Sequence, residues 1–277
     1  MITKIALAQL SASDDIEKNI QKAEHFMRKA AENQAHIICF PEMGFIKFFP
    51  QYRTDKKYFN YAEPVPGPTV ERFQKLAKKY SLVTIINIFE QEGSGFYFNT
   101  TPVIDQNGTL LGKAQMIHIA EEPFFNEKYY YTPGRTGFPV FHTQFGTIGL
   151  AICYDRHFPE QMRALVIQGV DFIFIPQAGV KGNPIELYEI EMRAASFTNQ
   201  VFIALVNRVG IEDQLEFIGG SFVTNPTGSI IAYAGTDKEE LLLADCDLSL
   251  IEKMRQECPF LRDRRPELYS ILQQQPV

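Results

Sequence analysis

Cys153 combines a nucleophilic side chain with a position at the end of an apolar, strand-like run. Residues 147–152 (TIGLAI) precede it, and residues 153–160 read CYDRHFPE. A strand-to-helix turn of this kind presents a side chain at the carboxyl end of a strand, where α/β proteins place nucleophiles. The alternative is a small core thiol, since free cysteines are among the most buried residues.

Two carboxylates follow apolar or aromatic segments in a similar way. Glu42 lies in Phe-Pro-Glu, just after the apolar run 36–40 (HIICF), and Glu127 lies within FNEKYYY. A strand-end carboxylate could face the same cleft as Cys153, and aromatic surroundings raise the pKa of an acid toward general acid/base work. The alternatives are a capping or surface role for Glu42 and a buried ion pair with Lys128 for Glu127.

The composition is that of an ordinary globular protein. The 277 residues carry a formal net charge of −6, with 45% hydrophobic and 22% charged residues. This charge argues against a nucleic-acid surface, and no run approaches the ~18 apolar residues of a membrane span. The four cysteines show neither zinc-ligand spacing nor a disulfide framework, and no Gly-rich phosphate loop is present. We therefore expect no metal, no cofactor, no membrane contact and a reducing, cytoplasmic location.

Apolar runs of β type alternate with amphipathic helical stretches along the chain. The spacing predicts helices over 14–32, with a capping box from Asp14 and Glu17, and over 69–80, 159–168 and 185–199. In the last of these, Leu187, Ile190, Ala194 and Phe197 share one face. The predicted strands are 4–10, 36–40, 82–89, 98–104, 109–119, 139–142, 147–152, 171–175, 201–206, 217–224, 229–233 and 241–246.

These elements predict a single α/β domain over residues 1–277, with a C-terminal arm from about 259. The number of strands is large for one open sheet, so we expect two packed sheets with helices outside. The arm mixes charged and aromatic residues, and it could be a solvated end or could lie across a partner subunit.

The motifs taken together resemble the nitrilase superfamily of carbon–nitrogen hydrolases over nearly the whole chain. Phe-Pro-Glu ends at Glu42, Asn-Glu-x-Tyr-Tyr contains Glu127, and Gly-x-x-Ile-Cys-Tyr-Asp-x-x-Phe-Pro-Glu contains Cys153. The similarity continues through 193–194, 199–200, 207–210, 219–221 and 226–228 to DRRPELY at 263–269.

The resemblance implies a four-layer αββα sandwich, two mixed sheets between outer helices, which usually forms homodimers or larger assemblies. It implies a Glu–Lys–Cys triad that needs no metal or cofactor. Cys153 matches the nucleophile, Glu42 the general base and Glu127 a second glutamate that positions substrate or shuttles a proton. The backbone N–H of Tyr154 matches an oxyanion donor.

The lysine of the triad is where this chain departs from the pattern. The family reads Gly-Lys-Tyr-Arg-Lys-x-His, whereas residues 112–118 read GKAQMIH, which places Met116 at the expected lysine position. A thioether cannot donate a hydrogen bond to an oxyanion. Lys113 would point to the opposite face of a regular strand, and Lys181 lies in a later loop that could reach the cleft.

The resemblance favours hydrolysis of an amide or N-carbamoyl bond in a small molecule. In carbamoylases that act on N-carbamoyl amino acids, an arginine at the position of Arg156 grips the substrate carboxylate, a role that suits its planar fork. Other motifs look more like the N-carbamoylputrescine branch. Because of Met116, a weakly active or non-catalytic member that binds a small amide or a protein partner is the main alternative, and acyl transfer to an acceptor other than water is a third.

Overall fold

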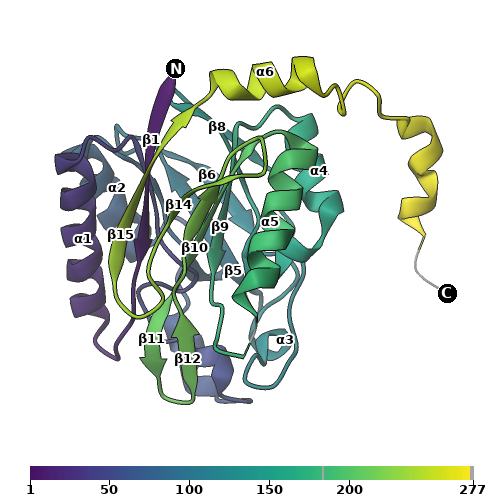
Figure 1. Cartoon of the computed structure of the whole chain (residues 1–277). Coiled ribbons are helices and arrows are strands. Elements are labelled where there is room, and N and C mark those ends of the chain that lie inside the picture. Colours follow the sequence, from purple (N-terminus) through teal and green to yellow (C-terminus); the bar gives the residue numbers. More distant parts are fainter. Residues whose placement is uncertain (183, 275–277) are drawn as a thin grey trace.

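The computed structural model describes residues 1–182 and 184–274. Its core consists of two sheets that lie face to face, with helices on both outer surfaces (Figure 1). The predicted αββα sandwich of two mixed sheets is therefore confirmed.

The first sheet contains the N-terminal strand and runs in the order β15-β1-β2-β3-β5-β4, with β6 paired to the other side of β5. The strands β1, β2 and β3 are parallel, while β15 pairs antiparallel to β1. The bounds are β1 (Ile2–Gln9), β2 (Ile37–Cys39), β3 (Val83–Ile85), β4 (Ile88–Gln91), β5 (Tyr97–Ile104), β6 (Leu110–Gln115) and β15 (Glu240–Asp247).

The second sheet carries the strand that precedes Cys153 and runs in the order β14-β13-β10-β9-β8-β7. Its centre, β8-β9-β10, is parallel, so the carboxyl ends of these strands lie at one edge. The bounds are β7 (Val140–Thr143), β8 (Gly146–Leu150), β9 (Phe172–Gln177), β10 (Phe202–Asn207), β13 (Phe222–Thr224) and β14 (Ile230–Tyr233); a hairpin of β11 (Val209–Glu212) and β12 (Leu215–Ile218) stands apart.

Helices α1 (Ile16–Glu32) and α2 (Pro68–Tyr80) cover the first sheet, and α4 (Pro159–Ile167) and α5 (Ile185–Asn199) cover the second (Figure 1). Three apolar clusters fill the gaps between these layers, one between the two sheets and one under each helix pair. Shorter helices are α3 (Glu127–Tyr130) and α6 (Ser249–Glu257), with 3₁₀ turns η1 (Phe49–Gln51), η2 (Lys56–Tyr61), η3 (Cys153–His157) and η4 (Pro266–Gln273).

Two of the predicted strands are each divided in the structure. The run 82–89 becomes β3 and β4, because the polar Asn87 between them turns its side chain to the backbone N–H of Met43 instead of extending the ladder. The run 217–224 is broken at Gly219 and Gly220, which adopt φ values of 59° and 63°, outside the range of a strand.

Smaller differences concern helix boundaries and short elements. The side chain that caps α1 belongs to Asp15, which accepts from the Lys18 N–H at 3.1 Å, rather than to the predicted Asp14. The elements α3, α6 and β11 are absent from the sequence prediction, since each is short and carries little periodic signal.

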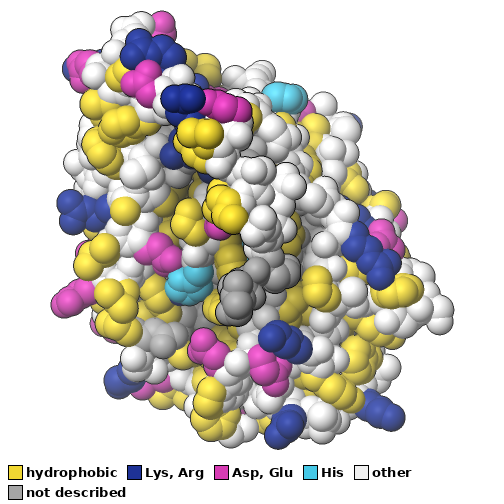
Figure 2. Space-filling model, turned by 90° about the vertical axis from the view of Figure 1, so that its right-hand side faces the viewer, with side chains coloured by type: hydrophobic (Ala, Val, Ile, Leu, Met, Phe, Trp, Pro, Cys, Tyr) yellow, Lys and Arg dark blue, Asp and Glu magenta, His cyan; other side chains and the backbone are white. Residues whose placement is uncertain are grey.

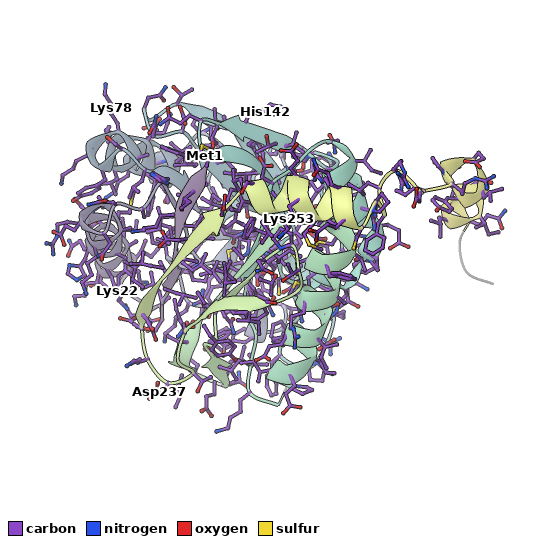
Figure 3. All side chains as sticks on the ribbon, turned by 45° about the horizontal axis from the view of Figure 1, so that its top comes forward. Met1, Lys22, Lys78, His142, Asp237 and Lys253 are labelled. Carbon is purple, nitrogen blue, oxygen red and sulfur yellow. The ribbon has the colours of Figure 1, made fainter. Side chains whose placement is uncertain are left out.

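None of the helices in the described part of the chain combines the length and apolar content that a bilayer crossing requires. The charged side chains labelled in Figure 3, such as Lys22, Lys78 and Lys253, lie at the periphery of the molecule. Beyond α6 the chain leaves this body, and the segment up to residue 273 projects outward as an arm (Figures 1 and 3).

Phe174, on β9, lies wholly buried between the two sheets. We expect Phe174→Ala to lower the free energy of unfolding by about 3–5 kcal/mol, because it removes buried area and leaves a cavity that rigid sheets cannot close. Urea denaturation measures this change. The control Ile167→Ala, on the exposed face of α4, should change it by no more than about 0.5 kcal/mol, and an equal loss in both variants would contradict the prediction.

Candidate active site

Cys153 lies in the turn between β8 and α4 and adopts an unusual backbone conformation. Its φ is 47°, in the left-handed region that residues other than glycine seldom occupy. The turn continues as η3, and Pro159 begins α4 at once. Only 6% of Cys153 is exposed to solvent. The surrounding structure thus holds the thiol in a strained turn, an arrangement that is frequent at functional sites.

The side chain of Asp155 holds this turn against the loop that follows β6. It accepts hydrogen bonds from the N–H of Ile152 at 3.1 Å and from the N–H of His118 at 2.9 Å. The His118 ring lies 2.8 Å from the same carboxylate through Nδ1 and stacks on Phe158, with ring centroids 3.5 Å apart. Asp155 therefore fixes the position of the loop at residues 116–118 relative to Cys153.

Glu42 follows β2 in a loop that a buried arginine supports. Arg208, fully buried, donates through Nη1 to the backbone carbonyl of Glu42 at 2.8 Å and through Nη2 to that of Ile46 at 3.0 Å. The carboxylate of Glu212 balances its charge, with Nη2 to Oε2 at 2.6 Å. The guanidinium replaces solvent for carbonyls that would otherwise be buried without donors.

The carboxyl of Glu42 accepts a hydrogen bond from the Asn99 amide, Nδ2 to Oε1, at 2.6 Å. Asn87 orients that amide by donating to Asn99 Oδ1 at 2.7 Å, and it accepts from the N–H of Met43 at 2.8 Å. The other carboxyl oxygen, Oε2, is buried without a hydrogen-bond partner in the described structure. One half of the carboxyl is thus held rigidly and the other is unsatisfied.

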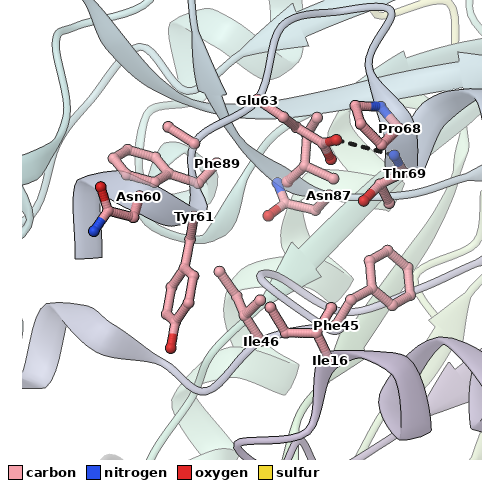
Figure 4. Close-up of a pocket in the computed structure, with 12 residues that line it drawn as sticks. Ile16, Phe45, Ile46, Asn60, Tyr61, Glu63, Pro68, Thr69, Asn87 and Phe89 are labelled. Carbon is pink, nitrogen blue, oxygen red and sulfur yellow. Dashed lines mark hydrogen bonds between the residues drawn. The ribbon is translucent and has the colours of Figure 1, made fainter. Parts of the chain in front are cut away.

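Asn87 also lines a cavity on the side of the first sheet's loops, which is shown in Figure 4. It measures about 310 Å³, and the Glu63 carboxylate on its border accepts from the Thr69 N–H at 2.9 Å. Burial raises the pKa of Glu63 above its usual value. This cavity is separate from the one that Cys153 lines.

Glu127 opens α3, and its side chain is completely buried. Oε2 accepts from the N–H of Ala120 at 3.3 Å, whereas Oε1 has no hydrogen-bond partner within residues 1–182 and 184–274. The predicted alternative, an ion pair with Lys128, does not occur in the structure as described. Glu127 is therefore a second buried carboxyl with a free oxygen.

Burial dominates the electrostatics of these three groups. Loss of solvent raises the pKa of Glu42 to about 7, against the opposing effects of the Cys153 thiol and the Asn99 amide. Burial, followed by the nearby Glu42 carboxyl, raises the pKa of Glu127 well above its usual value. Burial and both carboxyls raise the pKa of Cys153. The resting site therefore keeps its thiol protonated, while Glu42 exchanges a proton near neutral pH.

Met116 borders the same group of residues. It is fully buried, clusters with Cys153 and Tyr131, and its sulfur lies 3.4 Å from the Nδ2 of Asn99. A thioether accepts this contact but can donate nothing to an oxyanion.

The two lysines that sequence analysis considered as substitutes are placed in other ion pairs. Lys113 binds Glu90 and, at 3.0 Å, Glu92. Lys181 binds Glu216 at 3.0 Å, with 70% of its side chain exposed. The structure does not bring either lysine to the carboxyls of Glu42 or Glu127.

A small cavity of about 50 Å³ opens at Cys153, with Tyr154 and Arg156 in its wall. Arg156 is 6% exposed; its Nη1 donates to the carbonyl of Cys153 at 2.9 Å and to Gln177 at 3.0 Å. Its Nε lies 3.4 Å from the Glu191 carboxylate. The acidic neighbour of Arg156 is therefore Glu191, which comes from α5.

Sequence reasoning missed two polar residues of this site, Asn87 and Asn99, whereas Tyr131 belongs to the aromatic run that it noted around Glu127. The hydroxyl of Tyr131 is buried without a hydrogen-bond partner in the described chain, and its pKa is raised by burial and by Glu127. An amide side chain inside an otherwise largely apolar run, as Asn87 is in LVTIINIF, is the signal that could have identified that residue.

We expect the pH dependence of stability to report the buried Glu42 carboxyl. In the unfolded chain it loses its proton near 4.5, and in the folded protein at about 7, so its contribution to stability decreases as pH rises between these values. The free energy of unfolding of Glu42→Gln, relative to that of the parent protein, should increase by about 3 kcal/mol between pH 4.5 and pH 8. Urea unfolding at both pH values measures this gain, with Glu71→Gln on exposed α2 as control; a pH-independent difference would refute it.

The family model for "Carbon-nitrogen hydrolase" matches residues 4–256. The chain is 36% identical to an N-carbamoylputrescine amidase of Solanum lycopersicum, across 98% of this chain and 95% of the relative. It is 32% identical to a citrullinase of Francisella tularensis, across 96% of each. A carbon-nitrogen hydrolase structure from Helicobacter pylori G27 superposes with a TM-score of 0.95 at 28% identity, covering 100% of both chains. The protein therefore belongs to the carbon-nitrogen hydrolase family and is a hydrolase of the nitrilase superfamily.

Proposed function

We propose that the protein hydrolyses the amide or N-carbamoyl bond of a small molecule through a thioester on Cys153. The observation that supports this most strongly is the thiol in a strained turn, buried in electrostatic contact with the carboxyls of Glu42 and Glu127. Each carboxyl keeps one oxygen without a hydrogen-bond partner in the described structure, so both have capacity for a substrate.

Glu42 is the proposed general base. A base whose pKa lies near the operating pH is both available and effective in proton transfer, and burial brings the pKa of Glu42 to about 7. Its carboxylate takes the proton of Cys153 as the sulfur attacks the carbonyl carbon. The Asn99 hydrogen bond fixes the carboxyl orientation during this step.

The later steps use Glu127 and the backbone of η3. Protonated Glu127 donates a hydrogen bond to the substrate, and the N–H of Tyr154 donates to the developing oxyanion. Ammonia or an amine leaves with the proton from Glu42, and water, activated by the same carboxylate, then cleaves the thioester.

The substrate class follows from the relatives and from the cavity wall. N-carbamoylputrescine and citrulline, the compounds in the names of the tomato and Francisella relatives, both carry a ureido group small enough for the space at Cys153. Arg156 stands on the cavity wall and is proposed to meet a carboxylate at the far end of the substrate, in exchange for Glu191. No metal or cofactor enters these steps.

Ammonia release from N-carbamoyl-β-alanine, N-carbamoylputrescine, citrulline and simple ω-amides tests the proposed hydrolysis. Cys153→Ala should lower turnover by at least roughly 1000-fold, because the covalent step is lost. Cys258→Ala, which removes a half-buried thiol near the arm, should match the parent protein. Turnover that survives Cys153→Ala would overturn the proposal.

Met116 favours a second candidate, a protein that binds a small amide without turning it over. This function predicts saturable binding of the same compounds by the parent protein with no ammonia release. It also predicts that Met116→Lys gains hydrolytic activity. Turnover by the parent protein excludes this candidate.

The outer face of α5 supports a proposed homodimer. The residues that share this face, predicted from helical spacing, are exposed: Leu187 to 57% and Ile190 to 60%, while α5 buries the opposite side. Hydrophobic side chains gather on the face that carries the arm (Figure 2), and a cavity of about 710 Å³ lies between the arm and α4. A second copy of the chain would cover both, with each arm from about residue 259 reaching across its partner.

Leu187→Glu and Ile190→Glu should convert the proposed dimer to a monomer, because a buried unpaired carboxylate opposes association. Light scattering after size exclusion at micromolar concentration measures the mass. Ile211→Glu, at an isoleucine on β11 that is 76% exposed, is the control and should remain dimeric. A parent protein that is monomeric would refute the proposed interface.

The free cysteines fit the proposed cytoplasmic location.

A further inference from the structure

Within residues 1–182 and 184–274, neither site carboxyl has a basic side chain as a hydrogen-bond or ion-pair partner. Glu42 accepts from the amide of Asn99 and Glu127 from the backbone of Ala120, and in the described chain neither carboxyl pairs with lysine or arginine. Both are fully buried. Such paired carboxyls are costly to ionise unless something positive lies between them.

The basic side chains around the site are already neutralised by other acids. Arg208 pairs with Glu212, and its hydrogen bond to Glu42 reaches only the backbone carbonyl. Arg156 lies beside Glu191. Arg156 approaches Cys153 only through its backbone carbonyl, so a cation in direct contact with the sulfur and the two carboxyls would come from the ligand.

A neutral amide is poorly matched to this arrangement. When the thiolate attacks its carbonyl, an oxyanion forms beside two carboxyls, and Met116 offers it no donor. Loss of one oxyanion donor typically slows such a reaction by about 100- to 1000-fold. Within the described residues, neither carboxyl has a lysine or arginine bonded to it that could offset this negative charge directly.

We propose that the site preferentially takes a planar, cationic amidine or guanidine head group and hydrolyses its carbon–nitrogen bond. The inference rests on the proposed role of Cys153 as nucleophile. Amidinium N–H groups match the unsatisfied oxygens Oε2 of Glu42 and Oε1 of Glu127 as charge-assisted donors. Attack of a thiolate on an amidinium carbon gives a neutral adduct, so no oxyanion donor is needed at Met116.

The steps balance for a guanidinium substrate. The Cys153 proton passes to Glu42, the sulfur–carbon bond forms, and the C=N π electrons move to nitrogen. That nitrogen takes the proton from Glu42 and leaves as ammonia, which leaves an S-alkylthiouronium cation on Cys153. Water adds to its carbon and gives up a proton to Glu42. The carbon–sulfur bond then breaks, the departing thiolate takes the remaining proton of the added water, and the Glu42 proton passes to ammonia. The net reaction converts a guanidinium and water into a ureido compound and ammonium.

The cavity at Cys153 suits such a head group. Its volume of about 50 Å³ holds a small planar group, since one water needs only about 10–15 Å³ of comparable space. Phe125 and Tyr188 form aromatic walls. The Arg156 guanidinium already lies over the Tyr188 ring, 4.3 Å from its centroid, so Phe125 is the aromatic side chain left to attract a bound cation. The charged or titratable groups on the wall are Glu122, Arg156 and His157, and Glu191 contacts both Arg156 and His157.

Matched substrate pairs that differ only at the head group test the preference. Citrulline is compared with arginine, N-carbamoylputrescine with 4-aminobutylguanidine, and β-ureidopropionate with β-guanidinopropionate, by ammonia release and kcat/KM on the purified full chain. We expect the guanidino member to exceed its ureido partner by roughly 100-fold in at least one pair. A ureido partner that is equal or faster in all pairs overturns the inference while leaving the proposed hydrolysis intact.

Met116→Lys supplies the fixed charge and should reverse the preference, raising ureido turnover about 100-fold and lowering guanidino turnover. Met116→Leu, the matched apolar control, should keep the guanidino preference. An unchanged ratio in a folded Met116→Lys protein, judged by its thermal melt, would overturn the inference.

Binding to Cys153→Ala separates recognition from chemistry. Calorimetry should show arginine bound at least tenfold more tightly than citrulline, a difference of about 1.4 kcal/mol. If no compound is turned over by the parent protein but this difference is found, the recognition of a cation stands and the proposed hydrolysis fails. Equal or weaker binding of arginine overturns the inference.

Discussion

Burial of the Glu42 carboxyl beside the Cys153 thiol is the constraint on which the site depends. A carboxyl removed from water retains its proton to about pH 7, and only geometry held from outside keeps it there. Arg208 holds the backbone by donating to the Glu42 carbonyl. Asn99 holds the carboxyl by donating to it, and Asn87 orients Asn99. These residues act on the chemistry by preventing the carboxyl from turning toward solvent.

The sandwich converts distant stretches of sequence into one site. Glu42 comes from the end of β2 in the first sheet, and Cys153 from the end of β8 in the second. Packing of the two sheets through a shared apolar cluster fixes the distance between these strand ends. Asp155 adds a local connection, because its carboxylate accepts from the backbone N–H of Ile152, next to η3, and from that of His118, in the loop after β6.

The charge balance of the site follows from the partners that its basic residues take. A thiol and two carboxyls lie together, and the surrounding basic residues are committed to Glu212, Glu191, Glu90 and Glu216. A low-dielectric site with this balance favours neutral groups at rest and a cation on binding. The exposed face of α5 is a separate feature, since its apolar side chains are not buried by packing within a single copy of the chain.

The sequence by itself determined the layers, the strand ends that carry chemistry and the three candidate reacting residues. Alternating apolar periodicity and turn chemistry are local properties, so they can be read without coordinates, and they place Cys153 and Glu42 after strands. The roles expected for these residues rest on the resemblance to the family. Only the tertiary structure decided which acidic residues the lysine and arginine side chains pair with. Lys113, Lys181 and Arg156 are long, flexible side chains whose partners lie up to 35 residues away, so no local pattern could assign them. The breaks at Asn87 and at Gly219, and the outward face of α5, depended likewise on neighbours brought together by folding.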